Sequence, residues 1–452
     1  MLNKKIIVAI TAMTLLAGGT AWAKVSPAEA EKLKGNDLTP MGAERAGNAD
    51  GTIPAWDGGL TSVPAGIDYK PKTALADPFA SDKMLFKINA ANIGQYEDKL
   101  TVAVAAFLKK HPEVSLDVYQ SRRTAAAPQK VYDLNVKNAT TIELAADRNG
   151  VINNGINGGV PFPIPQSAEE VLFNNLLRWR GKGMEGRVRT AVVQPSGKIN
   201  WGGNDQVEYY PWNDWSKPFV GDYYKIFAKY GPLPARRKGE IAVVIDALSD
   251  PRKAWQYMPG QRRVRRAPAI SFDTPNPAGS GLSTYDDVFI FNGSLERYDW
   301  KLLGKKEIYL PYNSYKFESA SNEEIFSPIM PGKDVSRWEL HRYWVVEGTL
   351  KEGKRHAYGK RVVYVDEDSW NSLAQDAYDN KGNIWRGNYS NAITAYSLPA
   401  LLQVSNVSFD LTRDDYFIQN IFTNEDGSFP LLDMTKDDNY FTPESARRLG
   451  RR

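Results

Sequence analysis

Hydrophobic and polar positions alternate along most of the chain after residue 187, in short segments that turn residues separate. Alternation with a period of two is typical of a strand with one buried face, and a series of such segments is typical of an antiparallel meander. The pattern therefore predicts a mainly β fold with some helix, in the α+β class. The predicted strands span residues 188–193, 206–209, 223–230, 241–248, 254–258, 262–268, 300–303, 307–310, 338–350, 358–366, 376–378, 384–389 and 404–411.

The chain before residue 187 has a different pattern, with many glycines and prolines and little alternation. Residues 24 to about 130 contain too many turn residues to build a core, so we expect them to wrap the main domain, with Trp56 as an anchor. Helical spacing of apolar positions predicts a helix over residues 93–110. We expect a wrapping and helical region over residues 24–186 and an open β domain over residues 187–452, forming one compact unit.

A second helix is predicted to begin at Ser167, because Ser167 and Glu170 have the spacing of a capping box. The apolar stripe that follows ends near Arg180. Arg178 and Arg180 then have an ordinary role as positive charges that complement the dipole at the C-terminal end of this helix.

The first residues have the pattern of a secretory signal peptide. Two lysines precede an apolar run over residues 6–16, and an Ala-Trp-Ala cleavage site ends at Ala23. We therefore expect residues 1–23 to be removed by cleavage after Ala23. The run is too short to span a membrane, and no later segment approaches about 18 uncharged apolar residues. The sequence has no cysteine for disulfides or for a lipid anchor, and the combination indicates a bacterial periplasm.

The charges are almost balanced, with 57 Lys and Arg against 53 Asp and Glu. Since the signal segment contains Lys4 and Lys5 and no acidic residue, the mature chain carries two more basic than acidic residues. This balance does not indicate a nucleic-acid partner. Aromatic residues make up 12% of the chain, which favours a sheet with much aromatic surface.

The most informative motif is Trp-Gln-Tyr-Met-Pro-Gly-Gln-Arg-Arg-Val-Arg-Arg at residues 255–266. It predicts a β-hairpin with Trp255 and Tyr257 on one face of the first strand and Arg263 and Arg265 on one face of the second. Aromatic rings beside guanidinium groups suit a ligand with an apolar body and an anionic head. The ordinary alternative is a solvated edge hairpin whose charges prevent pairing with another sheet.

The predicted strand over residues 338–350 carries aromatic residues on both faces. One face is therefore expected to line a core and the other a cavity. Tyr343 and Trp344, on opposite faces, are further candidates for the wall of a ligand site. Ordinary core packing is the alternative for each candidate.

Little in the sequence indicates metal or cofactor chemistry. The histidines are His111, His341 and His356. His341 and His356 flank a predicted hairpin, but no organised acidic partner accompanies them, so no metal site is predicted. The motifs of zinc proteases, of nucleophile elbows and of phosphate-binding loops do not occur, and we expect neither a cofactor nor an enzyme activity.

Two alternatives to a non-enzymatic role remain open. The carboxylate pairs Asp366 with Asp368 and Asp286 with Asp287 would suit a hydrolase acting on glycan or lipid, although such pairs are common on protein surfaces. A structural subunit of an envelope complex would instead show an exposed aromatic patch and no hollow.

The arginine-rich hairpin resembles a motif of the LolA/LolB-like superfamily of periplasmic and outer-membrane lipoprotein carriers. In smaller members a Trp-x-Tyr-x-Pro-x-x-x-Arg-Val-Arg-Arg segment precedes a loop with a Ser-Tyr/Asp-Asp pattern. The matching positions here are Trp255, Tyr257, Pro259, Arg263, Val264, Arg265 and Arg266, followed by residues 283–287. The resemblance implies a strongly curved, incomplete antiparallel β-barrel over residues 187–411, whose apolar cavity is covered by helices and loops and binds acyl chains without chemistry.

The whole mature chain is similar to a large proteobacterial family of unknown function that is described as outer-membrane-lipoprotein-sorting-like. The similarity runs through residues 38–59, 158–165 and 378–382. Members are often encoded near resistance-nodulation-division exporters and outer-membrane proteins, which implies a role in envelope transport. The long N-terminal region and an insertion around residues 273–282 depart from the simple carriers, and would either close the cavity around a smaller molecule or create a docking face.

We therefore expect a periplasmic, non-enzymatic carrier or assembly factor that binds a hydrophobic ligand, such as a lipid or an acyl chain, in an open β-barrel. An exporter or an outer-membrane protein is the expected partner. The predicted ligand-binding residues are Trp255, Tyr257, Arg263, Arg265, Tyr343 and Trp344.

Overall fold

The computed structural model describes residues 24–267, 270–422 and 429–451, and the predicted signal peptide lies outside them. Within these residues sixteen strands form one sheet. The hydrogen-bonded order is β1-β2-β12-β13-β14-β15-β16-β17-β5-β6-β7-β8-β9-β10, with β11 paired to β12 and β18 paired to β5. The long strands pair antiparallel with their neighbours.

The strands have these bounds: β1 Phe86–Asn89, β2 Ser115–Val118, β5 Gly183–Val193, β6 Ile199–Tyr209, β7 Asp222–Tyr230, β8 Ile241–Ala247, β9 Lys253–Met258, β10 Arg263–Arg266, β11 Tyr298–Pro311, β12 Trp338–Leu350, β13 Lys360–Asp366, β14 Ser372–Tyr378, β15 Ile384–Ala395, β16 Ala400–Asp410, β17 Tyr416–Ile421 and β18 Leu431–Leu432. A separate small hairpin consists of β3 Glu143–Leu144 and β4 Val151–Ile152.

The helices of the described chain are short. They are α1 Pro27–Ala30, α2 Val102–Lys110, α3 Gln129–Thr141, α4 Ala168–Leu177, α5 Tyr315–Ser319, α6 Asn322–Ile325 and α7 Pro443–Gly450. As predicted, Ser167 caps α4, because its hydroxyl accepts a hydrogen bond from the Glu170 amide at 3.4 Å. In the part of the chain that the structure covers, every helix is too short or too polar to cross a membrane.

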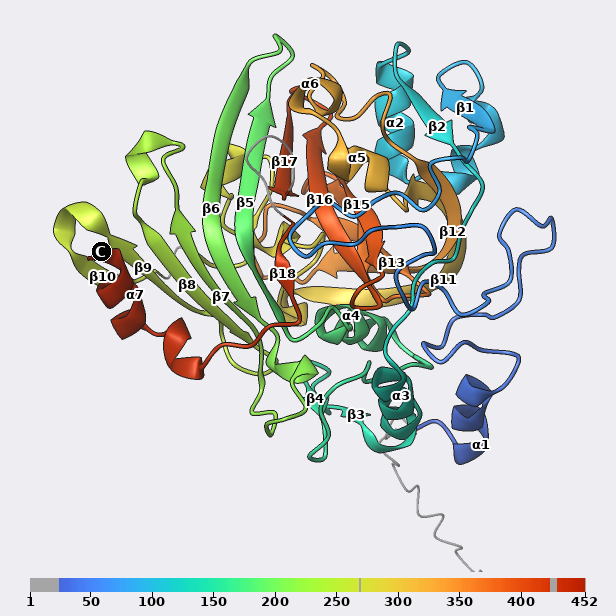
Figure 1. Ribbon diagram of the computed structural model, residues 1–452, viewed down its shortest axis with the longest axis horizontal. Helices are drawn as coiled ribbons and strands as arrows, with labels where there is room; N and C mark the ends of the chain where they lie inside the picture. Colours follow the sequence, from blue (N-terminus) through green and yellow to red (C-terminus); the bar gives the residue numbers. More distant parts are fainter. Residues whose placement is uncertain (1–23, 268–269, 423–428, 452) are drawn as a thin grey trace, which may run out of the picture.

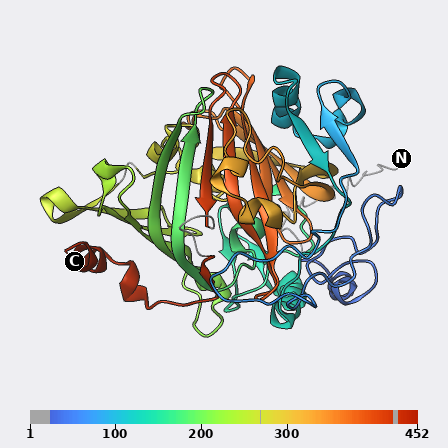
Figure 2. The ribbon, with the colours of Figure 1, turned by 45° about the horizontal axis from the view of Figure 1, so that its top comes forward.

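The sheet is an incomplete barrel, as the sequence predicted. Strands β5 and β6 are long and visibly curved (Figures 1 and 2). Among the described strands, β10 pairs with β9 alone and β11 pairs with β12 alone, so the curved sheet does not close on itself. The predicted mainly β fold class is therefore confirmed.

Different segments cover the two faces of the sheet. We call inner the face on which α4 packs against β11, β12 and β13, and along which the segment after β10 returns, behind the strands in Figure 1. We call the other face outer. On the outer face, α2 contributes to the largest hydrophobic core, where the rings of Phe107 and Phe409 of β16 are 5.1 Å apart. The helix α7 covers β8, β9 and β10 on the same side.

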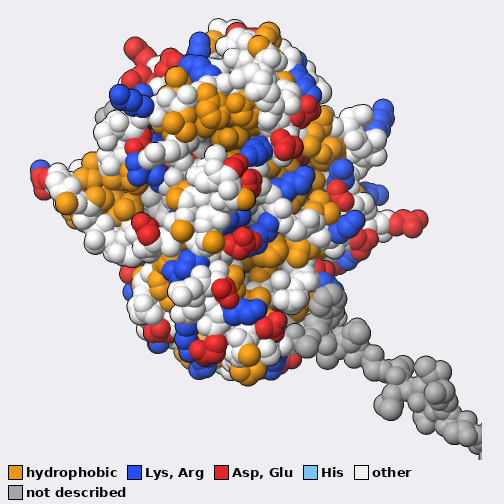
Figure 3. All heavy atoms as spheres, turned by 90° about the vertical axis from the view of Figure 1, so that its right-hand side faces the viewer, with side chains coloured by type: hydrophobic (Ala, Val, Ile, Leu, Met, Phe, Trp, Pro, Cys, Tyr) orange, Lys and Arg blue, Asp and Glu red, His pale blue; other side chains and the backbone are white. Residues whose placement is uncertain are grey.

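The N-terminal region lies along one side of the sheet and is anchored there. The indole of Trp56 is buried and donates a hydrogen bond to the carbonyl of Ala125 at 3.0 Å, while the guanidinium of Arg45 lies 5.1 Å from its ring. On the face of the molecule that carries this region, basic and acidic side chains are interspersed with hydrophobic ones (Figure 3). Trp56 is thus the anchor that the sequence predicted.

Several elements differ from the prediction. The helix expected over residues 93–110 begins only at Val102, because Thr101 caps it with a hydrogen bond from the Val104 amide. The strands β1 and β2 and the helix α3 were not predicted. The helix α7, which packs on the sheet and contains Arg447 and Arg448, was not predicted either.

Candidate ligand cavity

A cavity of about 960 Å³ lies on the inner face of β5 to β10. Residues 270–292 form its cover. Apolar wall residues include Val188, Val192, Tyr224, Ile226, Val244 and Val288. Polar wall residues include Asn204, Gln206, Glu208, Gln256, Asn292 and Gln419. The wall is therefore mixed rather than purely apolar, which differs from the implication of the family resemblance.

Alternation along the strands builds this wall. In β5, Val188, Thr190 and Val192 face the cavity, whereas Ala191 and Val193 belong to the hydrophobic core of the outer face. The same period of two places alternate residues of β7 and β8 in the wall, and those of β6 from Asn204 to Glu208.

Arginines line one end of the cavity, near the turns at the ends of β7 and β10. Arg237 is engaged there, since it pairs with Glu240 at 3.0 Å and its guanidinium lies 3.5 Å from the ring centre of Tyr230. Arg236, Arg265 and Arg266 are exposed. Among the described residues these three have no ion pair, so this rim carries free positive charge.

The predicted hairpin is present, and its two faces have different surroundings. Arg263 and Arg265 lie opposite Met258 and Gln256, on the inner face, and Arg265 lines the cavity whereas Arg263 does not. Val264 lies opposite Tyr257 on the outer face.

Trp255 and Tyr257 do not line the cavity. Both pack in a hydrophobic cluster with Phe441 and Ala446 from the C-terminal region. The alternation of aromatic and other side chains between the two faces of the hairpin was predicted. The face that carries Trp255 and Tyr257 is, however, the outer one, and α7 covers it.

Tyr343 and Trp344 of β12 also lie away from the cavity wall. Tyr343 is fully buried in the core of the outer face. Trp344 packs on the inner face, where its ring is stacked on that of Trp370 at 6.3 Å and the ammonium of Lys305 lies 4.8 Å from its centre. As predicted for this strand, the two residues belong to different clusters; ligand binding by them stays a prediction.

Charged groups that the sequence did not predict as a site lie beside the cavity wall, where the guanidinium carbon of Arg180 is 5.4 Å from the ring centre of Tyr224. Arg180 is 6% exposed, and its guanidinium carbon lies 3.9 Å from the ring centre of Tyr210 and 4.4 Å from that of Phe289. Arg178 is 3% exposed and donates to the side chains of Asn371 and Gln403. The role at the C-terminal end of α4 that the sequence predicted agrees with the structure for Arg178, which donates to the carbonyl of Asn175 in the last turn of this helix. The burial of both arginines beside the aromatic core was not predicted.

Glu208 lines the cavity next to these arginines and is itself buried. It accepts hydrogen bonds from the amide of Gln206 at 2.9 Å and from the hydroxyl of Tyr210. Burial raises the pKa of Glu208 above its usual value, although the charge of Arg180 opposes this shift. Burial and the neighbouring Arg180 lower the pKa of Arg178 well below its usual value. The sequence contained a signal for these wall residues, because Gln206 and Glu208 alternate with Val207 along the strand. Polar positions in a strand normally indicate the solvent face, so this signal does not indicate a cavity.

The acidic pair Asp286 and Asp287 has a structural role beside the cavity. Arg361 pairs with Asp286 at 2.6 Å and with Asp287 at 3.1 Å, and all three side chains are buried. Arg361 and His356 hold the pKa of Asp286 far below its usual range, against the effect of burial. The carboxylates of the cavity wall are instead Glu208 and Glu240.

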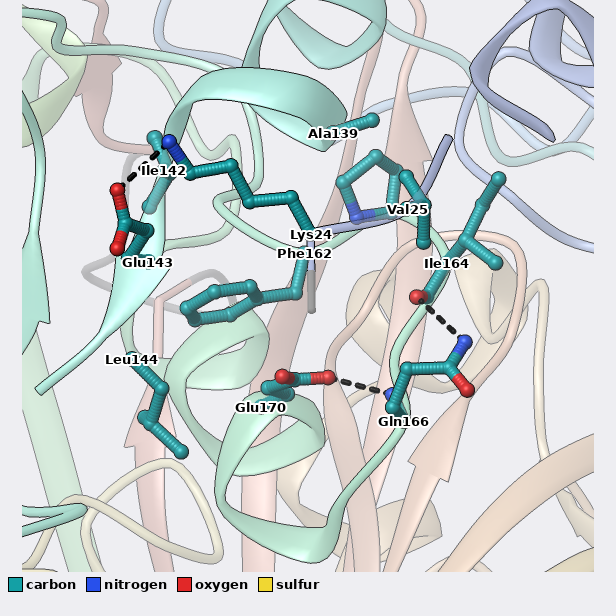
Figure 4. A pocket seen from close by; sticks show the side chains of 11 residues that line it. Lys24, Val25, Ala139, Ile142, Glu143, Leu144, Phe162, Ile164, Gln166 and Glu170 are labelled. Carbon is teal, nitrogen blue, oxygen red and sulfur yellow. Dashed lines mark hydrogen bonds and ion pairs between the residues drawn. The ribbon is translucent and has the colours of Figure 1, made fainter. Parts of the chain in front are cut away.

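A second, much smaller pocket of about 30 Å³ lies where the described chain begins. The ammonium of Lys24 pairs with Glu143 at 2.6 Å across this pocket, and Phe162 and Leu144 form its floor (Figure 4). Its volume is close to that of a single water molecule, so it does not suit a lipid.

Residues 87–447 match a family model whose description is protein of unknown function DUF1329. The chain belongs to the DUF1329 family. The family membership that the sequence predicted is thereby confirmed. An uncharacterized relative in Pseudomonas aeruginosa, PA3922, is 39% identical over 455 residues, which cover 98% of this chain and 97% of that protein.

Three solved structures are similar to this DUF1329 chain at low identity. A DUF1329 family protein from Desulfovibrio piger is 15% identical, with 59% of this chain and 92% of that one covered and a TM-score of 0.40. A putative outer membrane lipoprotein-sorting protein domain from Vibrio parahaemolyticus is 14% identical, with coverages of 62% and 97% and a TM-score of 0.43. The LolA superfamily protein NE2245 from Nitrosomonas europaea is 13% identical, with coverages of 62% and 100% and a TM-score of 0.38.

Proposed function

We propose that this DUF1329 protein is a periplasmic, non-enzymatic carrier or envelope assembly factor that binds a hydrophobic ligand with an anionic group. The observation that carries the proposal is the cavity of about 960 Å³ on the inner face of an open sheet. Cavities of about 300 to 1,000 Å³ are typical of small-molecule sites. The apolar part of its wall suits the body of a lipid, and its arginine rim suits a carboxylate or phosphate.

The energetics of such binding need no covalent step. Burying a methylene group contributes about 0.8 kcal/mol, so an acyl chain of about a dozen methylenes offsets the cost of association. Arg236, Arg265 and Arg266 would add charge-assisted hydrogen bonds at the rim.

The location and the partner are parts of the same proposal. The signal peptide predicted over residues 1–23 supports a periplasmic location. The family resemblance supports an exporter of the resistance-nodulation-division class or an outer-membrane protein as partner. The described names of two similar structures, which concern lipoprotein sorting and the LolA superfamily, agree with a carrier role.

A cavity-filling variant tests this proposal. Ala228 and Ala242 lie opposite each other on β7 and β8, and both line the cavity. Replacing both by tryptophan fills this part of the cavity, so we expect displacement of a fluorescent fatty acid to weaken by at least tenfold, which corresponds to about 1.4 kcal/mol.

The matched control places the same two tryptophans at exposed alanines, Ala65 and Ala91, which lie outside the cavity wall. We expect this control to bind as the unchanged protein does. Equal affinity in the cavity variant and the control, with both folded by circular dichroism, would show that the cavity is not the binding site.

A further inference from the structure

A buried cluster on the outer face, separate from the cavity, contains His341 of β12, Asp366 at the end of β13 and Asp368 just beyond it. One possible ligand atom from each residue lies within 4.8 Å of the others. All three side chains are buried, with His341 1% and Asp366 0% exposed. None of the three lines the ligand cavity.

Asp366 differs from the acidic residues around it. Arg123 pairs with Asp368 at 2.6 Å, and Arg342 pairs with Glu367 at 2.6 Å. Among the described residues, Asp366 has no cationic partner. Its Oδ2 atom accepts hydrogen bonds from the hydroxyls of Ser369 and Tyr312, but its Oδ1 atom has no partner in the described chain.

A second buried group at the same place also lacks a partner. Tyr343 lies directly opposite Asp366 in the pairing of β12 with β13, so the two side chains are neighbours on one face. The side chain of Tyr343 is fully buried, and within the described residues its hydroxyl has no hydrogen-bond partner. Buried polar atoms in proteins are normally satisfied, so the unpartnered carboxylate oxygen of Asp366 and the unpartnered hydroxyl of Tyr343 can both accept a further partner, such as an ion or a water molecule.

Each possible ligand is held by an outer partner. One ring nitrogen of His341, Nε2, lies 3.0 Å from the carboxylate of Glu339, which leaves Nδ1 for another contact. The ring of Tyr312 stacks on the imidazole at 3.9 Å. Arg123 fixes both oxygens of Asp368, at 2.8 and 2.6 Å. A carboxylate that orients a ligating histidine is a recurrent feature of metal sites.

We propose that His341, Asp366 and Asp368 form a binding site for a divalent transition-metal ion, with Zn²⁺ as the best match. One imidazole nitrogen and two carboxylate oxygens are ligands of Zn²⁺, whereas Ca²⁺ and Mg²⁺ prefer sites made of oxygen alone. The ion would supply the positive charge that Asp366 lacks.

The site would have a structural effect rather than a role in ligand binding. Arg123, which holds Asp368, also donates to the backbone carbonyls of Glu44 and Arg45 in the N-terminal region. An ion at the site would therefore stabilise the contact between the N-terminal region and the sheet. This inference does not depend on the proposed carrier function.

The test uses the full mature chain, stripped with EDTA and then dialysed against Zn²⁺. We expect elemental analysis by mass spectrometry to find about one zinc per chain, and the melting temperature to rise when Zn²⁺ is added. Asp366→Asn keeps the shape of the side chain and removes its charge. This variant should lose the bound zinc and the zinc-dependent shift, while melting in EDTA at or above the temperature of the unchanged protein.

His111→Gln is the matched control. His111 is another buried histidine, with carboxylates of Glu113 and Asp414 at 3.3 and 3.1 Å, and its loss should change neither the zinc content nor the shift. Absence of stoichiometric zinc in the unchanged protein would overturn the proposal. Retention of zinc by Asp366→Asn would overturn it as well.

A spectroscopic measurement covers the case in which Asp366→Asn does not fold. In this measurement Co²⁺ replaces Zn²⁺ in the unchanged protein. Co²⁺ bound by nitrogen and oxygen ligands at low coordination number should absorb visible light, and this absorption should disappear when Zn²⁺ is added and displaces the Co²⁺. A spectrum identical to that of Co²⁺ in buffer would contradict the proposed site.

Discussion

At the scale of single residues, charged groups occupy both ends of the cavity. Arg265 is exposed at the rim, Glu208 is buried in the wall, and Arg180 is buried near Glu208 but outside the wall. An exposed arginine contributes little to stability, whereas a well-aligned hydrogen bond to a charged ligand contributes about 1.5 to 3 kcal/mol. The rim is therefore the place where substitutions should separate binding from folding.

We expect Arg265→Gln to weaken retention of an anionic amphiphile by roughly tenfold or more, with an unchanged melting temperature. Arg263→Gln is a close control, because Arg263 is exposed on the same face of the same strand but does not line the cavity. Displacement of a fluorescent fatty acid measures both variants. Equal losses of affinity in the two variants would indicate general electrostatic attraction. Unchanged affinity in both would indicate that the arginines of the hairpin only prevent pairing with another sheet.

Glu208 gives a prediction about pH. Its pKa in the folded protein is raised above the usual 4.5, mainly by burial, so folding favours the protonated carboxyl. The stability that this group contributes is fully present below about pH 4.5 and is lost as the pH rises through the raised value. Glu208→Gln removes this titration.

We therefore expect the melting temperature of Glu208→Gln, measured relative to the unchanged protein, to increase as the pH rises above about 4.5. Thermal unfolding at several pH values between 5 and 8 checks this, with the exposed Glu352→Gln as a control that should follow the unchanged protein. A difference that stays constant over this range would mean that Glu208 is ionised throughout.

At the scale of elements, α7 determines which face of the hairpin is covered. Tyr257 is 1% exposed. Its ring lies so close to Gly450 of α7 that a Cβ atom added to this glycine would be 2.2 Å from a ring carbon of Tyr257. Tyr257 thus packs directly against the helix, and its side chain points away from the cavity.

We expect Tyr257→Ala to destabilise the protein by about 3 kcal/mol or more, the range found when large aromatic side chains are removed from a core. Affinity for a fluorescent fatty acid, measured where the variant is still folded, should change little. Urea unfolding and displacement together test this, and a variant of normal stability that has lost its affinity would contradict the placement of Tyr257.

The same elements show what the sequence can and cannot predict. The strand over residues 338–350 was predicted with its observed bounds. Its alternating pattern is thirteen residues long, so the first and last residues of the strand are well defined by the sequence. Alternation also paired the right residues of the hairpin on common faces. It does not say which face turns inward, and that choice depended on α7, whose few apolar residues give a weak signal in a basic tail.

At the scale of the whole molecule, the open sheet has a hydrophobic core on its outer face and a partly polar hollow on its inner face. Polar positions in a strand normally indicate the solvent face, yet Gln206 and Glu208 line the cavity. Likewise, Asp366 and Asp368 come together with His341 only through the pairing of β12 and β13 and the turn after it. The pairing of neighbouring strands decides which side chains meet at both sites, and the periodicity of a single strand does not predict it.

The most direct test of the central claim is native mass spectrometry of the protein purified from periplasm, beside the Ala228→Trp and Ala242→Trp double variant. Both residues line the cavity, so filling it should remove whatever the cavity holds. We expect the unchanged protein to carry an additional mass that fragments as a lipid or another anionic amphiphile, and the double variant to carry none. An unchanged protein without such a mass, or a double variant that retains it, would contradict the proposed carrier function.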